Sequence, residues 1–305
     1  MINGSLTESA VLAEGLVKSY GKVKALGGVS LDVRHGETFG IIGPDGAGKS
    51  TLFRLLTSLL VPDSGSAQVE GLDTVKDYRE IRKIIGYMPG KFSLYQDLTV
   101  EENLTFFATL FGTTIDENYH LIEDIYKQIE PFKARMAGKL SGGMKQKLAL
   151  CCALIHKPKV LFLDEPTTGV DPVSRKEFWD MLGRLKNDGI TILVSTPYMD
   201  EAGRCDRIAL IRNGKFLTVN SPAGIIAEFP DRLYSVRSDR MHALLGDLRA
   251  YSGTIRAFSF GESVHLSTGD GFSKDDLRKF LQDRKHNNVE INAIRPSVED
   301  CFMRI

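Results

Sequence analysis

A glycine-rich segment that begins at Gly43 has the residue types and spacing needed to hold phosphate groups. Its sequence fits the pattern G-x-x-x-x-G-K-[ST] and reads Gly43-Pro44-Asp45-Gly46-Ala47-Gly48-Lys49-Ser50, followed by Thr51. Glycines let backbone N–H groups approach phosphate oxygens, and the positive end of a following helix faces the same anion. Lys49 would bring a mobile positive charge to the β and γ phosphates, and the Ser50 hydroxyl would bind Mg²⁺. A plain glycine turn that starts a helix is the alternative, but it does not account for Lys49 and Ser50.

Two carboxylates follow a short apolar run and form a second candidate site element. Val160–Leu163 is followed by Asp164 and Glu165. In open α/β sheets, ligands bind at the carboxyl ends of the strands, so both side chains can face the glycine-rich loop. We expect Asp164 to hold Mg²⁺ through water and Glu165 to polarise the attacking water. An acidic strand cap is the simpler interpretation for one carboxylate, but the ordered pair is more specific.

The elements that must position these residues alternate between strands and helices. Val29, Leu31 and Val33 recur with period two, and Thr38–Ile42 is a buried-strand run that leads into the loop. Leucines with helical spacing follow the loop, from Leu52 to Leu60. A further apolar run at 190–194 comes after Asp164 and Glu165, and the region 81–149 is predicted to be mainly helical. This alternation predicts a parallel sheet covered by helices.

A change of pattern near residues 220–230 predicts a second, smaller domain. Pro222, Gly224 and Pro230 cluster there. Beyond them we expect strands at 233–236, 254–260, 263–266 and 289–294, and helices at 241–251 and 274–284. The order βαββαβ favours a small ferredoxin-like unit. A final helix at 298–303 would start at Ser297, with Asp300 as its capping-box partner.

Composition and charge argue against several classes of function. Lys+Arg and Asp+Glu balance at 39 each, so no net positive charge argues for a nucleic-acid partner. No apolar run approaches the roughly 20 residues of a membrane span, and the first 20 residues do not resemble a signal peptide. The cysteines have no metal-site spacing, and we expect buried, reduced thiols at Cys151, Cys152, Cys205 and Cys301.

The segment Leu140–Gln146, which reads LSGGMKQ, closely resembles the signature motif of ATP-binding cassette (ABC) proteins. The resemblance covers Val11 to Ser221. It implies an α/β fold, a P-loop nucleotide-binding domain with an antiparallel β subdomain and a helical subdomain. We therefore expect an ABC-type domain at 1–221 and a small α+β, ferredoxin-like accessory domain at 222–305.

The resemblance also implies roles for particular residues. Ser141, Gly142 and Gly143, with Gln146 in the same motif, would contact the γ-phosphate of ATP held by an opposite subunit. Tyr20 would stack on adenine, although an ordinary strand-end tyrosine is the simpler alternative. The loop Gly169–Asp171 resembles the one that couples the two sites of a dimer. ATP and Mg²⁺ are the implied cofactors, and two domains would enclose two ATP molecules head to tail.

The C-terminal segment indicates which branch of the ABC family the chain resembles. The segment Ile294–Phe302 is similar to the end of ATPases from drug- and polysaccharide-export systems. That similarity implies an ATPase that energises an exporter through separate membrane permease subunits. It would lie in the cytoplasm, peripheral on the inner face of the cell membrane, as a homodimer or as a heterodimer with another ABC ATPase. Soluble cassette proteins that act on DNA or ribosomes fit less well, because this chain has one cassette and no net charge.

Three positions depart from the family pattern. Gly90 follows Gly86-Tyr87-Met88-Pro89 where glutamine is usual, and Pro197 stands at the place of the switch histidine. Neither side chain offers a hydrogen-bond donor. Asp45 replaces a commoner asparagine, and we expect its carboxylate to cap N–H groups of the loop. These departures leave open an alternative function, a hydrolytically weak ATP-binding subunit that pairs with a second, complete ATPase.

Overall fold

The computed structural model describes residues 9–305, which divide after Ser221 into two compact units. The first eight residues of the expected ABC-type domain, which also begin the 20-residue segment examined for a signal peptide, lie outside the described residues. Each unit has its own hydrophobic core. None of the helices within 9–305 is both long and apolar enough to cross a membrane.

The first unit contains two sheets. One is antiparallel, with the order β2 (Val23–Arg34), β1 (Ser9–Tyr20), β4 (Ser64–Val69) and β5 (Leu72–Asp73). The other has the order β10 (Lys215–Asn220), β9 (Arg207–Arg212), β3 (Thr38–Ile42), β8 (Thr191–Thr196), β7 (Val160–Asp164) and β6 (Ile85–Met88). Its strands run parallel except β10. Because β3, β7 and β8 are buried along their whole length, they read as continuous apolar runs.

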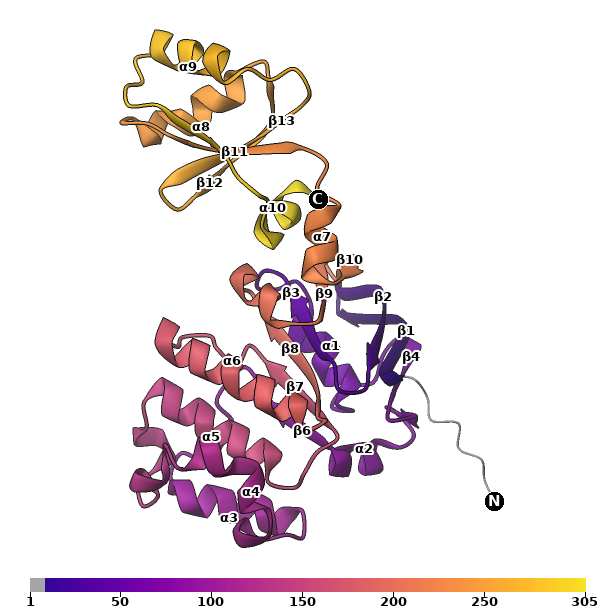
Figure 1. Cartoon of the computed structure of the whole chain (residues 1–305). Coiled ribbons are helices and arrows are strands. Elements are labelled where there is room, and N and C mark those ends of the chain that lie inside the picture. The colour runs from indigo at the N-terminus through magenta and orange to yellow at the C-terminus, as the bar shows by residue number, and fades with distance from the viewer. Residues whose placement is uncertain (1–8) are drawn as a thin grey trace. The chain divides into compact units, whose positions relative to one another are not determined.

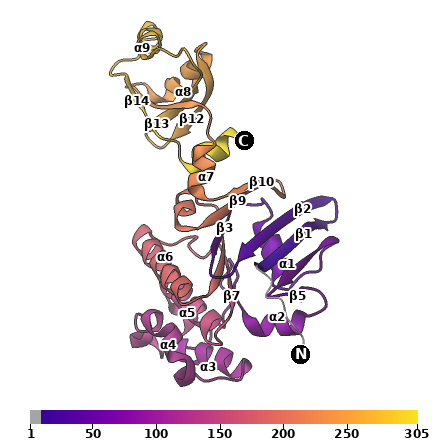
Figure 2. The ribbon, with the colours of Figure 1, turned by 45° about the vertical axis from the view of Figure 1, so that its right-hand side comes forward.

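Helices of the first unit surround the parallel sheet. Helix α1 (Lys49–Leu56) lies between the two sheets, and α6 (Pro172–Asn187) lies on the opposite face of the parallel sheet (Figure 1). A helical region beside β6 contains α3 (Val100–Leu110), α4 (Ile115–Tyr126) and α5 (Gly142–Leu154). Figure 2 shows these three helices grouped together. Thr99 and Thr114 begin α3 and α4 with capping boxes that satisfy free N–H groups. Shorter helical elements are α2 (Tyr78–Ile84), η1 (Glu130–Phe132), η2 (Ala137–Lys139) and η3 (Met199–Arg204).

The prediction of mainly helix across 81–149 is wrong at one place. Residues Ile85–Met88 form strand β6, the outer strand of the parallel sheet. The strand has four residues and lies directly after α2, so the helical pattern of its neighbours obscured it. Gly86 suits this strand because a Cβ there would lie 2.4 Å from the Ala153 carbonyl oxygen of α5.

The second unit begins with a short helix, α7 (Pro222–Ala227), where the sequence suggested only a boundary. The order is then β11 (Arg232–Arg237), α8 (Met241–Ala250), β12 (Thr254–Phe260), β13 (Ser263–Thr268), α9 (Lys274–Asp283), β14 (Glu290–Ala293) and α10 (Val298–Arg304). The sheet is antiparallel with the order β12-β13-β11-β14, and leucines of α8 and α9 share its core. The expected N-cap Ser273 and the Ser297–Asp300 capping box are present.

All four cysteine thiols are buried, as expected. Burial raises the pKa of Cys151, Cys152, Cys205 and Cys301, because the thiolate would lose its hydration. A raised pKa leaves less thiolate at pH 8, and the thiolate is the reactive form. We expect a thiol reagent such as Ellman's reagent to react slowly with the native protein and rapidly with all four thiols in denaturant. Rapid reaction of the native protein would contradict this burial.

Candidate functional site

The phosphate-binding motif forms a tight loop between β3 and α1. A Cβ at Gly43 would lie 2.2 Å from the Ile211 carbonyl oxygen, so no larger residue fits there. Gly48 has φ +108°, and a Cβ there would lie 2.6 Å from the Ala25 carbonyl oxygen. Positive φ and close backbone approach both favour glycine. The loop therefore ends at the start of α1, where free N–H groups favour an anion.

Lys49 is buried and points back into the loop. Its ammonium donates to the carbonyl oxygens of Gly43 at 2.8 Å and Pro44 at 3.0 Å. It also forms an ion pair with Glu165 Oε1 at 3.0 Å. Only 2% of its side chain is exposed, so this charge is held almost entirely by protein groups. The structure thus brings together Lys49 and Glu165, which lie far apart in the sequence.

Asp164 and Glu165 lie at the carboxyl end of β7, beside β8. Ser195 of β8 donates from Oγ to Asp164 Oδ1 at 2.5 Å. The Glu165 N–H donates to the Ser195 carbonyl oxygen at 3.0 Å, which holds Glu165 at φ +51°. A non-glycine residue in this left-handed region is uncommon, and such strain often marks functional sites. Sequence reasoning missed Ser195, because a serine inside an apolar strand gives no distinctive signal.

Tyr87 of β6 lies near this acidic group. Burial and the nearby charge of Asp164 raise the pKa of Tyr87 to about 12. Its phenol therefore stays neutral at physiological pH.

The three unusual positions have different surroundings. Gly90 lies against the acidic pair, where a Cβ would be 3.1 Å from the Asp164 carbonyl oxygen and 3.7 Å from Glu165 Cβ. Pro197 follows directly after β8. The expected capping role of Asp45 is wrong: its side chain is 87% exposed, and its contact with Lys49 is a distant 3.9 Å. Water solvates this carboxylate more favourably than the crowded loop would.

Tyr20 ends β1, and its side chain is exposed. The adjoining hairpin returns as β2, whose Ala25 contacts Gly48 of the phosphate loop.

The signature motif forms a separate site at the start of α5. Ser141 is the N-cap, and its Oγ accepts from the Met144 N–H at 3.4 Å. No hydrogen bond or ion pair within residues 9–305 joins Ser141–Gln146 to the loop Gly43–Thr51. Asp171 caps the neighbouring helix α6, and hydrogen bonds from backbone N–H groups lower the pKa of this carboxyl.

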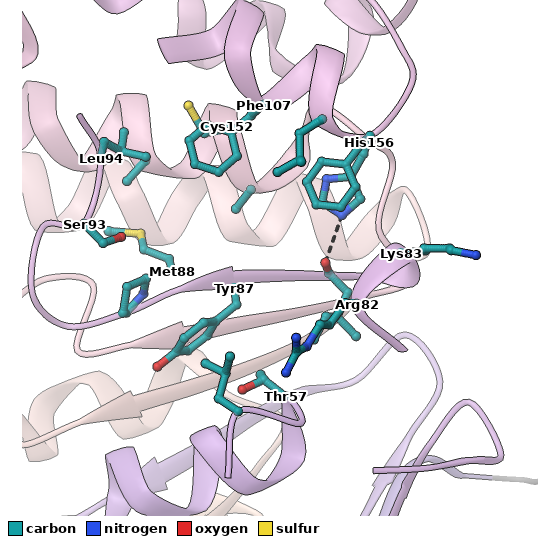
Figure 3. A pocket seen from close by; sticks show the side chains of 17 residues that line it. Thr57, Arg82, Lys83, Tyr87, Met88, Ser93, Leu94, Phe107, Cys152 and His156 are labelled. Carbon is teal, nitrogen blue, oxygen red and sulfur yellow. Dashed lines mark hydrogen bonds between the residues drawn. The ribbon is translucent and has the colours of Figure 1, made fainter. Parts of the chain in front are cut away.

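An apolar groove of about 480 Å³ lies between β6 and the helical region. Figure 3 shows Met88, Leu94 and Phe107 around it, and Arg82 and Lys83 at one end. His156 donates from Nε2 to the Ile85 carbonyl oxygen at 2.8 Å, and burial lowers the pKa of this imidazole. The groove therefore has an apolar lining and an edge that is basic through Arg82, since Lys83 already pairs with Glu80 at 2.9 Å.

Comparisons with known proteins agree with this arrangement. The sequence model described as "ABC transporter" matches residues 26–168. The chain is 34% identical to the Nod factor export ATP-binding protein I of Rhizobium sp. (strain N33), covering 98% of each chain. The chain belongs to the ABC transporter family.

Other relatives place the cassette in the same branch. The chain is 38% identical to the probable multidrug ABC transporter ATP-binding protein YbhF of Escherichia coli (strain K12), over 98% of this chain and 52% of that protein. It therefore spans about half the length of YbhF. Together with the relatives named for Nod factor export and daunorubicin resistance, this match confirms the expected resemblance to the drug- and polysaccharide-export branch.

Solved ABC cassettes share the fold of the first unit. The dimeric structure of MJ0796, a bacterial ABC transporter cassette, aligns with a TM-score of 0.64 at 26% identity, covering 69% of this chain and 98% of that one. An ATP-binding subunit of an ABC transporter aligns with a TM-score of 0.67 at 28% identity, covering 72% and 93%. The expected ABC-type α/β nucleotide-binding fold is thus confirmed, and the chain carries an ABC ATPase domain.

Proposed function

We propose that this protein binds Mg-ATP and hydrolyses it to energise export through a separate membrane permease. The observation that carries the proposal is the meeting of Lys49, Asp164 and Glu165 at the ends of β3 and β7. In this proposal Lys49 binds the β and γ phosphates, and Glu165 orients the attacking water. Tyr20 stacks on adenine, and the backbone of Gly43–Thr51 surrounds the phosphates.

The residues present fit a magnesium ion. Mg²⁺ prefers oxygen ligands and keeps several waters. The Ser50 hydroxyl would bind it directly and Asp164 through water, while Ser195 fixes the Asp164 carboxylate. The ion would neutralise charge on the phosphates during transfer.

We further propose that two cassettes close head to tail around two ATP molecules. Ser141, Gly142, Gly143 and Gln146 would then contact the nucleotide of the opposite subunit. The exposure of Ser141 and Gly142 and their separation from Gly43–Thr51 support this assignment. The second cassette is either a second copy of this chain or another ABC ATPase. The comparisons give no support to the hydrolytically weak alternative.

The second unit, 222–305, is in our proposal a ferredoxin-like accessory domain of the ABC domain at 1–221. Its βαββαβ order and antiparallel sheet β12-β13-β11-β14 support this assignment. We place the protein in the cytoplasm, peripheral on the membrane, with no nucleic acid as partner. The balanced charge supports that last point.

The groove beside β6 is the surface that we propose for the permease. An apolar groove with a basic edge suits an apolar permease segment that carries an acidic residue. We expect Leu110→Glu, at a lining position that is 62% exposed, to weaken association with the permease at least about tenfold. Association is measured by copurification from membranes, with ATP turnover of the isolated protein unchanged.

Ile255→Glu is the matched control for this prediction, because Ile255 is 51% exposed but belongs to the second unit. It should leave association unchanged. Equal association of the Leu110→Glu variant and the unaltered protein would rule out this surface.

The experiment that tests the function as a whole is transport into permease-containing inverted vesicles. ATP-dependent accumulation of a drug-like or oligosaccharide cargo, lost with Lys49→Ala, is the expected result. ATP turnover with no permease that responds to it would overturn the export part of the proposal.

A further inference from the structure

Glu201 is a buried carboxylate outside the proposed catalytic residues, and it has three side-chain partners. Only 3% of Glu201 is exposed. Its Oε1 accepts from Thr167 Oγ1 at 2.8 Å and from Arg175 Nε at 3.1 Å. Its Oε2 accepts from Thr196 Oγ1 at 2.6 Å. We call these four residues the Glu201 cluster.

The cluster joins three segments of the first unit that the proposed reaction uses. Thr167 lies two residues after Glu165, and Thr196 ends β8 directly before Pro197. Arg175 lies in the first turns of α6, four residues after the helix cap Asp171. The two loops that follow β7 and β8 are therefore attached to the start of α6 through one carboxylate.

Burial of the Glu201 charge makes all three hydrogen-bond partners necessary. A buried carboxylate is unfavourable unless charged and hydrogen-bonded partners satisfy it, so the cluster keeps its partners as a set. The Arg175 guanidinium also pairs with Asp200 Oδ2 at 3.1 Å and lies 4.2 Å from the centre of the Tyr198 ring. The planar Arg175 guanidinium is thereby held by Asp200 and by the Tyr198 ring. A lysine ammonium has no planar group that could make both contacts in this way.

The start of α6 meets the signature helix α5 in the same subunit. A Cβ at Gly143 would lie 3.5 Å from Ser174 Oγ, the neighbour of Arg175. Lys147 of α5 pairs with Glu177 of α6 at 3.1 Å. A continuous set of contacts thus runs from the loop after Glu165, through the Glu201 cluster and α6, to the signature motif.

We propose that Glu201 and Arg175 are positioning residues that hold the loop of Glu165 in place and transmit nucleotide occupancy to the start of α6. They contact neither nucleotide nor water of the reaction themselves. The proposal rests on the ATPase function proposed above and deepens it. The signature motif of each subunit would then sense whether the phosphate loop of that subunit is filled.

Variants of the 305-residue chain test this, with steady-state kinetics and Mg-ADP affinity as the first readouts. We expect Glu201→Gln and Thr167→Val to lower kcat at least about tenfold. KM and the Mg-ADP Kd should stay within about threefold, because neither residue touches the phosphate loop. Asp180→Asn is the matched control, since Asp180 and Arg204 form an exposed pair at 3.1 Å that also links α6 to η3. It should leave kcat unchanged.

Hydrogen–deuterium exchange provides the second readout. In the unaltered protein, Mg-ADP should slow exchange both at residues 43–51 and at residues 171–176. In Glu201→Gln and Thr167→Val, it should slow exchange only at 43–51. Arg175→Lys should recover part of the kcat lost in Arg175→Met, since the charge but not the fork geometry is restored.

The outcomes separate the two proposals. An unaltered protein without turnover overturns the ATPase function, while the exchange measurement still decides the role of the cluster. Variants with unaltered kcat and unaltered protection at 171–176 overturn the cluster proposal, as does a kcat loss matched by an equal loss of Mg-ADP affinity. If Glu201→Gln does not fold, Thr167→Val decides, because it keeps the buried ion pair of Glu201 and Arg175.

Discussion

Replacing Glu165 by glutamine is expected to reduce ATP turnover by about 10²- to 10⁴-fold while ATP binding is retained, because a positioned general base contributes a factor of that size. Glutamine keeps the shape of the side chain but does not accept a proton from the attacking water. Lys49 also loses its 3.0 Å ion pair and becomes free to bind phosphate, so ATP affinity should stay equal or increase. Turnover is measured by phosphate release, and affinity by equilibrium binding of a fluorescent ATP analogue.

Glu80→Gln is the control for this comparison. Glu80 pairs at the surface with Lys83 at 2.9 Å, so the same chemical change there should leave turnover unaltered. A Glu165→Gln protein that hydrolyses ATP at the unaltered rate would show that another group activates the water.

Restoring the two missing side chains should have the opposite effect. Gly90→Gln combined with Pro197→His is expected to raise kcat by about 10²-fold, since one donor aimed at developing charge is worth about 10²–10³ in rate. At Gly90 a Cβ would lie 3.1 Å from the Asp164 carbonyl oxygen, a tight contact that requires this backbone to shift by a few tenths of an ångström. Pro197 is only partly buried, and Thr196 before it is fixed by Glu201.

Gly90→Ala and Pro197→Ala separate side-chain chemistry from backbone effects. Both should leave kcat within about threefold, because alanine adds no donor to either position. If the double variant turns over ATP no faster than the unaltered protein, the site is already complete, and a residue outside the two family positions supplies the contacts.

The sequence predicted the chemistry of the site better than its connections. Lys49, Asp164 and Glu165 belong to motifs whose spacing reflects the chemistry proposed for them, so the sequence singles them out without the fold, and the structure pairs Lys49 with Glu165. Glu201 and Ser195 were not, because their contacts arise only when β7 and β8 become neighbours in the sheet. Asp45 was misjudged for a related reason: whether a loop carboxylate turns inward depends on the space left by the surrounding backbone.

Elements with a strong pattern were predicted with nearly correct limits. Strand β3 and the capping box at Ser297 depend on local residues only. Strand β6 was missed since four residues carry too little periodicity to distinguish a strand from the end of α2. Its pairing with β7 stabilises it, and a partner strand far away in the sequence is invisible to a local pattern.

The ion pair between Lys49 and Glu165 has a consequence for the timing of the reaction. In this structure the lysine holds Oε1 of Glu165 in an ion pair, while the Glu165 side chain stays 22% exposed. An incoming triphosphate competes for the same ammonium and thereby releases Glu165, the group that would activate the attacking water. ATP binding would thus free the base for hydrolysis, whereas a cassette without ATP would keep Glu165 in its ion pair with Lys49.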